Sequence, residues 1–248
     1  SMTDDTGIGG GRSKFPTTHH SAILAARSND SVERSRAMGV IIAAYWKPVY
    51  KYTRIQWRKS NEDAKDLTQA FFTRILEKEI LENFDPSRAK FRTYLRTCLD
   101  GFLANEQKAA ERQKRGGDAI ILSLDYESAE GELKQMEIPD SRNTEEYFEK
   151  EWARSFFDFC LMELKKSLET KGKLVQFHLF ERYHMESVEG ITYDVLAAEF
   201  GISVSNVTNY LAVVRREFRK IVLDRLRQLT ATDEEFARVA KLLLGIRL

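Results

Sequence analysis

Apolar residues recur at intervals of three and four along most of the chain, from about Thr17 to Gln113 and again from about Thr144 onward. Two clear runs are Val40, Ile41, Ala44 and Tyr45, and Phe71, Phe72, Ile75 and Leu76. This spacing places apolar side chains on one face of an α-helix. The sequence shows no internal repeat and no alternation strong enough for a sheet. We therefore predict an all-α protein.

The breaks in this pattern predict two small helical domains joined by an acidic linker. Residues 118–143 lack a sustained period and contain Gly131 and Pro139, as expected of a linker. The predicted segments are a flexible N-terminal tail over 1–16, a helical bundle over 17–117, the linker over 118–143, a second helical domain over 144–230, and an amphipathic C-terminal helix over 231–248. Thr232 is the expected N-cap of that last helix.

Three features of the first domain predict helix boundaries. Asn61 is expected to cap a helix that opens with acidic residues, which are favourable at the positive end of the helix dipole. Pro48 suits the first turn of a helix that restarts after Trp46. A long helix is expected from about Arg88 to about Gln113, ending before a pair of glycines.

Charge is distributed unevenly although the formal net charge is only +1. The stretch 86–117 holds eight cationic and three anionic residues, and 211–228 holds six and two, whereas acids far outnumber bases over 118–151. Basic stretches of this kind suit contact with phosphates. The chain therefore alternates basic, acidic and basic.

Several functional classes are disfavoured by composition. No run approaches the roughly 18 apolar residues of a membrane span, and the first residues lack the apolar core of a secretory signal, so we expect a cytoplasmic protein without membrane insertion. Cys98 and Cys160 are far apart and are expected to be reduced thiols. His178 and His184 lie six apart, off the spacing of a helical metal pair. We predict no metal site, no cofactor and no catalytic residue, and hence no enzyme.

The strongest local motif is a helix-turn-helix in the C-terminal third. Thr192 is placed to cap a short helix, Gly201 to make the turn, and Ser203 to cap a second helix. Residues near the start of that second helix would meet base edges of duplex DNA, and later arginines would meet phosphates. The first set is Ser203, Ser205, Asn206, Thr208, Asn209 and Tyr210; the second is Arg215, Arg216 and Arg219. The alternative is a helical hairpin that binds nothing.

Two motifs in order resemble a known family. The segment Ile191 to Arg219 resembles region four of sigma factors, and Asp63 to Phe72 (DAKDLTQAFF) resembles the region-two helix of the extracytoplasmic-function (ECF) group of the sigma-70 family. The resemblance also takes in Tyr45 to Tyr50 (YWKPVY) and Phe84 to Leu95 (FDPSRAKFRTYL), and it extends over about Thr17 to Arg227.

The resemblance implies an alternative sigma factor that binds core RNA polymerase, recognises and helps to melt promoter DNA, and directs transcription initiation. Its polymerase-binding residues would be Glu62, Asp63, Asp66, Thr68 and Gln69. Its minus-ten contacts would be Phe91, Arg92, Tyr94, Arg96, Lys108, Arg112, Lys114 and Arg115, unless these simply form an amphipathic helix with its aromatic side in the core. The second helix of the helix-turn-helix would hold the minus-thirty-five element. An anti-sigma factor or a Ser/Thr kinase is a further partner to consider.

Departures from the family pattern qualify these expectations. Lys65 occupies a position that is often acidic, and Thr68 beside it suggests a hypothesis in which phosphorylation adds about −1.5 to −2 of charge to the polymerase-facing patch. The alternative is that Thr68 is an ordinary helix residue. Asp100 and Gly101 stand where Arg-Asn is common, which puts the usual minus-ten contacts in doubt.

Two other readings of the chain remain open at this point. One is a stand-alone helix-turn-helix regulator that binds duplex DNA without joining polymerase. The other is a module that has lost DNA binding. The C-terminal helix, likewise, either packs back on region four or serves as a handle for a regulator.

Overall fold

The computed structural model describes residues 21–77, 79–110, 122–135, 143–186 and 190–245. Within these ranges the regular structure is entirely α-helical, which confirms the predicted fold class. The helices are α1 (Ala22–Ala25), α2 (Ser31–Ile55), α3 (Asn61–Leu76), α4 (Glu79–Glu82), α5 (Phe91–Ala110), α6 (Tyr126–Gln135), α7 (Thr144–Thr170), α8 (Leu174–His184), α9 (Tyr193–Phe200), α10 (Val204–Gln228) and α11 (Asp233–Leu244).

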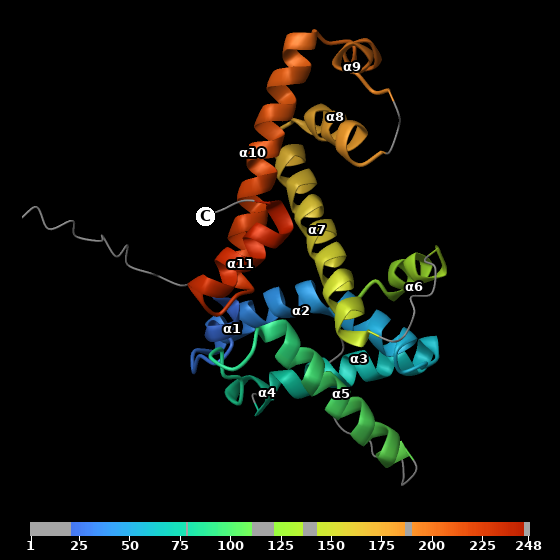
Figure 1. Cartoon of the computed structure of the whole chain (residues 1–248), viewed down its shortest axis with the longest axis vertical. Coiled ribbons are helices and arrows are strands. Elements are labelled where there is room, and N and C mark those ends of the chain that lie inside the picture. The colour runs from blue at the N-terminus through green and yellow to red at the C-terminus, as the bar shows by residue number, and fades with distance from the viewer. Residues whose placement is uncertain (1–20, 78, 111–121, 136–142, 187–189, 246–248) are drawn as a thin grey trace, which may run out of the picture.

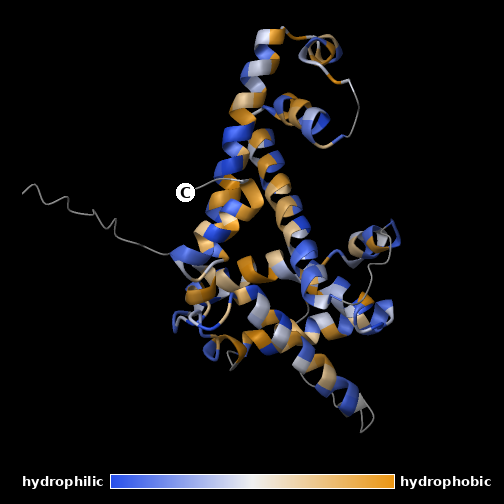
Figure 2. Cartoon of the chain, in the orientation of Figure 1, coloured by the Kyte–Doolittle hydropathy of each residue, from blue (hydrophilic) through white to orange (hydrophobic). Residues whose placement is uncertain are grey.

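The helices form a base with two long helices rising from it (Figure 1). Helices α1 to α5 make the base, α7 and α10 run side by side away from it, and α8 and α9 lie at the far end. Most helices carry a polar and an apolar side, as the mixed colours of Figure 2 show. Such helices are stable only when their apolar sides are packed together.

One continuous hydrophobic core joins the base to α7, α10 and α11. Tyr45 of α2 lies between Phe91 of α5 and Trp152 of α7, with ring centroids 5.6 and 6.2 Å away. The same core includes Val222 of α10 and Phe236 of α11, both buried. The segments predicted as two domains therefore share one core in this arrangement, and α11 packs into it rather than projecting from the molecule.

A second core holds the far end together. Leu164 of α7, Leu196 of α9 and Val207 and Leu211 of α10 are fully buried against one another, together with Phe180 of α8. This cluster fixes the angle between α9 and α10. It thereby positions the helix-turn-helix at the end of the two long helices.

The structure corrects two predicted helix boundaries. Helix α2 runs unbroken through Pro48, although we expected a restart there. A proline inside a helix costs about 3 kcal/mol, but Tyr45, Val49 and Tyr52 on either side of it are all buried, so packing holds the helix together. Ser60, not Asn61, is the N-cap of α3.

The acidic segment predicted as a plain linker contains a helix. Helix α6 lies within it and packs against α2. Its apolar positions are only Tyr126, Ala129 and Leu133, which have helical spacing but are too few, among acids and a glycine, to stand out as a period. The helix forms because tertiary contacts stabilise it.

No helix among the described residues is long and apolar enough to cross a membrane. Cys98 and Cys160 are both free thiols, and burial raises the pKa of Cys160 to about 12. Cys160 therefore acts as a small apolar side chain in the core.

Candidate nucleic-acid and protein interfaces

The helix-turn-helix is formed by the residues that the sequence indicated. Thr192 caps α9, its hydroxyl accepting a hydrogen bond from the Val195 amide at 3.3 Å. Gly201 ends α9 in the left-handed conformation with φ 64°, a region in which glycine is favoured. Ser203 then caps α10 by accepting from the Asn206 amide at 3.1 Å. The predicted caps and turn are confirmed.

The first turns of α10 present a polar, uncovered face. Ser203, Ser205, Asn206, Thr208 and Asn209 are exposed, and Tyr210 is half-buried. The Thr208 hydroxyl donates to the Val204 carbonyl at 3.1 Å, so its oxygen still has a lone pair for an outside donor. A helix with amides and hydroxyls at its open N-terminal end can read base edges in a major groove.

Three arginines follow on the same helix. Arg215, Arg216 and Arg219 are all exposed. Arg215 is held in place, since its Nε donates to His184 Nε2 at 2.9 Å and its guanidinium lies 5.6 Å from the centre of the Tyr183 ring. Burial and the Arg215 charge lower the pKa of His184, which keeps that imidazole neutral and able to accept.

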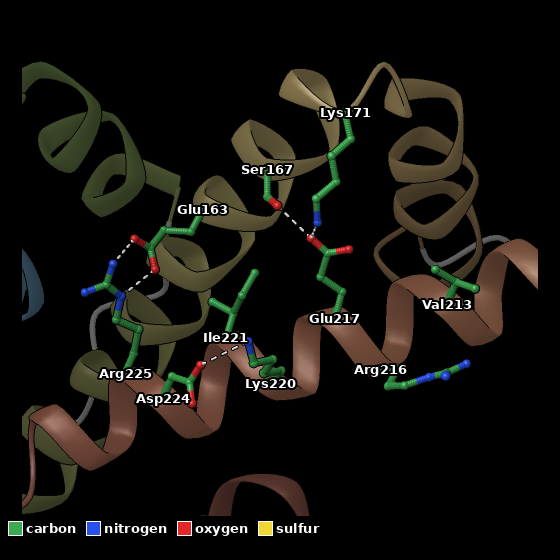
Figure 3. Close-up of a pocket in the computed structure, with 10 residues that line it drawn as sticks. All are labelled: Glu163, Ser167, Lys171, Val213, Arg216, Glu217, Lys220, Ile221, Asp224 and Arg225. Atoms are coloured by element: carbon green, nitrogen blue, oxygen red, sulfur yellow. Dashed lines mark hydrogen bonds and ion pairs between the residues drawn. The ribbon is translucent and has the colours of Figure 1, made fainter. Parts of the chain in front are cut away.

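Polar contacts across a groove between α7 and α10 fix the two helices to each other (Figure 3). Glu217 of α10 accepts from Ser167 at 2.6 Å and from Lys171 at 2.5 Å, and Arg225 pairs with Glu163. Arg216 points away from these pairs (Figure 3). The charged residues that cross the groove are thus paired with one another, whereas Arg216 is exposed to solvent.

Helix α3 exposes acids at its N-terminal end. Ser60 accepts from the Asp63 amide at 3.1 Å, and Glu62 pairs with Lys65 at 3.0 Å. Glu62, Asp63 and Asp66 are exposed. These three acids form a small acidic surface, which Lys65 partly neutralises through its pair with Glu62.

Gln69 and Thr68, which follow on α3, are not free. The Gln69 amide donates to the Leu122 carbonyl at 2.7 Å and accepts from the Leu122 amide at 2.8 Å. Thr68 is fully buried, and its hydroxyl donates to the Ala64 carbonyl at 2.7 Å. Phosphorylation of Thr68 was the hypothesis, with an ordinary helix residue as the alternative. The buried hydroxyl fits the alternative, because a kinase cannot reach it in this arrangement.

A family model described as "ECF sigma factor" matches residues 50–224, well over half of the chain. The chain belongs to the ECF sigma factor family. None of the curated proteins and none of the solved structures compared with it matches. The match takes in α3, α5 and the helix-turn-helix, so the surfaces described above lie in the part of this sigma factor that defines the family.

Of the five predicted minus-ten residues that the structure describes, four are buried or paired within this sigma factor. Phe91 is a core residue, with its ring 5.3 Å from that of Phe84. Tyr94 is half-buried and donates to the Ile80 carbonyl at 2.6 Å. The Phe91 ring therefore cannot stack on a nucleotide base in this arrangement, and the Tyr94 hydroxyl is engaged within the fold.

Arg92 is the clearest correction among the predicted DNA contacts. Its side chain is 1% exposed, its Nη2 lies 2.9 Å from Glu149, and its guanidinium is 4.1 Å from the centre of the Trp152 ring. Burial of this kind requires pairing. Arg92 therefore joins α5 to α7 and does not face DNA here.

Asp100 has a local structural role. It accepts from Tyr52 at 2.9 Å, from Trp57 at 3.0 Å and from Arg96 at 3.0 Å. The unusual acid noted in the sequence thus organises the end of α2 against α5, and it holds Arg96. Lys108 is exposed. Arg112, Lys114 and Arg115 lie outside the described residues.

Sequence reasoning missed the polar contacts that hold α2 to its neighbours. Lys51 is fully buried, and its Nζ lies 2.5 Å from both Glu151 of α7 and Glu132 of α6. The acidic excess over 118–151 signalled that bases must be nearby, but not which ones. Among the described residues, no three His, Cys, Asp or Glu side chains gather as a metal site would need.

Proposed function

We propose that this sigma factor docks on core RNA polymerase through the acidic end of α3 and reads the minus-thirty-five element with α10. The observation that carries the proposal is an intact helix-turn-helix with an uncovered polar N-terminal face on α10, in a chain that belongs to a family of transcription-initiation factors. The docking step is supported by the exposure of Glu62, Asp63 and Asp66. Charge complementarity between such acids and a basic partner sets orientation and association rate.

The minus-ten contact belongs, on this proposal, to the basic end of α5. Lys108 is exposed there, and the sequence continues with Arg112, Lys114 and Arg115. Cations in a row can hold the backbone of a displaced strand through phosphate contacts. Phe91 and Arg92 are not assigned to DNA, because both serve the core.

The test of polymerase docking uses purified full-length protein and core polymerase. Wild type should be retained on immobilised core and should start run-off transcription at specific sites on host promoters. Asp66→Lys should reduce core retention at least about tenfold, since it places a cation in the acidic patch. Glu169→Lys makes the same charge change on an exposed site near the end of α7 and should behave as wild type.

The test of promoter reading uses the same transcription reaction and a footprint. Asn209→Ala should weaken binding to the minus-thirty-five element by about 1 to 3 kcal/mol, seen as reduced protection in the footprint, without changing core binding. Asp224→Ala alters an exposed residue farther along the same helix and is the control. A protein that ignores core polymerase but protects duplex DNA would instead be a stand-alone regulator.

A further inference from the structure

Helix α6 lies on an aromatic and basic surface of α2. The Tyr126 ring is 5.1 Å from that of Tyr50 and 5.6 Å, edge-on, from that of Trp46. Ala129 of α6 and Ala64 of α3 are fully buried in the same small cluster. The contact is thus shared between the two helices that carry the family's region-two motifs.

The acidic side chains of α6 pair with the cations of α2. Glu130 accepts from the Tyr50 hydroxyl at 2.7 Å and from Arg54 Nε at 2.9 Å, and it forms an ion pair with Arg54. Glu132 pairs with Lys47 at 2.7 Å and Lys51 at 2.5 Å. The hydrogen bond from Arg54 holds the pKa of Glu130 at about 2, well below its usual value.

The segment before α6 reaches onto the polymerase-facing side of α3. Glu62, Asp66 and Gln69 lie on one stripe of α3, because residues three and four apart share a helix face. Leu122 binds the side chain of Gln69, at the end of that stripe. Burial raises the pKa of Tyr126 to about 12, and the nearby Asp66 carboxylate contributes to the rise. Residues 122–126 therefore occupy the space beside the stripe.

We propose that residues 122–135 are an intramolecular competitor of core polymerase, which must be displaced from α2 and α3 before polymerase can dock fully. The proposal rests on the proposed function, since it concerns the same docking surface. A helix with its side chains is about 10 Å across. A helical partner laid along Asp66 and Gln69 would overlap Leu122 and Tyr126.

Helix α6 is suited to such release. It is only 10 residues long and has Gly131 in its interior, so it is marginal on its own. It fully buries only Tyr126 and Ala129, with Leu133 partly buried beside them, and it is otherwise held to α2 by the polar contacts of Glu130 and Glu132. No residue of α6 belongs to the main core, and the segment touches that core only through the partly buried Leu122, so it can detach while the core stays packed.

The experiment measures the affinity of full-length protein for core polymerase in solution. Glu130→Lys places a cation against Arg54 and should open the segment. Glu127→Lys makes the same change in the same helix at an exposed position and is the matched control. Apparent affinity for core rises with the fraction of molecules whose segment 122–135 is open. Glu130→Lys should therefore bind core at least about tenfold more tightly than wild type.

A charge swap tests whether the effect of Glu130→Lys comes from loss of the Arg54–Glu130 ion pair or from the change in net charge. Arg54→Glu combined with Glu130→Arg restores a pair of opposite sign and should return affinity to within about threefold of wild type. Hydrogen exchange over residues 122–135 should increase when wild type binds core. Thermal melting of each variant shows that the base remains folded.

The outcomes distinguish the competitor proposal from the proposed function. Tighter binding by Glu130→Lys alone, reversed by the swap, supports the competitor. Equal binding by wild type, Glu130→Lys and Glu127→Lys, or unchanged exchange of residues 122–135 in the complex, overturns it while the proposed function stands. Failure of every variant and of wild type to bind core refutes the proposed function, and the competitor proposal falls with it.

Discussion

Lys51 is the residue whose replacement tests the interface between the base and α7 most directly. Its side chain has no exposed surface, and that of its partner Glu151 is 2% exposed. The Nζ of Lys51 lies 2.5 Å from Glu151 Oε1 and 2.5 Å from Glu132. Removing the cation in Lys51→Met would leave the Glu151 carboxylate buried, with the distant Arg154, at 3.8 Å, as its remaining ion-pair partner among the described residues.

The expected loss of stability follows from this geometry. Breaking a buried pair by removing one partner costs about 3 to 5 kcal/mol, and replacing both partners with apolar residues is often neutral. Because Arg154 retains part of the interaction, we expect about 3 kcal/mol for Lys51→Met. For a chain of this size that lowers Tm by about 6 to 12 °C. Adding Glu151→Met should recover most of the loss.

The assay is urea unfolding followed by tryptophan fluorescence, with thermal melting as a second measurement. Lys65→Met is the control, since Lys65 pairs with the exposed Glu62 and such surface pairs contribute less than about 1 kcal/mol. The reasoning would be refuted if Lys51→Met stayed within about 1 kcal/mol of wild type. It would also be refuted if the double variant were no more stable than the single one.

Three further predictions follow from single positions. Gly201→Ala should cost about 1 to 2 kcal/mol and weaken duplex binding, since φ there is 64° and alanine is strained in that region; melting and gel shift measure it. Arg92→Ala should destabilise the fold by about 2 to 4 kcal/mol but leave the salt dependence of DNA binding unchanged. Arg219→Ala should instead reduce the slope of log affinity for DNA against log salt concentration by about 1. The pKa of Glu130 is lowered to about 2, so its stabilisation is full above about pH 4.5 and lost toward pH 2; the stability difference between wild type and Glu130→Gln should shrink over that window, as urea unfolding at each pH would show.

The sequence by itself determined the local features whose causes are local. Thr192, Gly201 and Ser203 form the caps and turn that their spacing indicated, because capping and left-handed turns depend on residues within one turn of each other. Thr232 caps α11 for the same reason. The all-α class followed from apolar spacing alone.

Only the tertiary structure decided which of the candidate residues are accessible. Arg92 and Arg219 are both arginines on basic helices, yet one is 1% exposed between Glu149 and Trp152 and the other is open to solvent. Thr68 likewise lies on a face that the sequence left open and that the fold buries. Burial depends on which distant segment packs on a face, and a helical period reports the face but not its partner.

Helix α6 is an element that the sequence alone did not predict. Its acids predicted a solvated linker, but Glu130 and Glu132 find Arg54 and Lys51 some 80 positions earlier in the chain. Ten residues with an internal glycine have too little intrinsic tendency to form a helix alone. Contacts with α2 supply what the local sequence lacks, so this helix and the surface it covers were decided by tertiary structure.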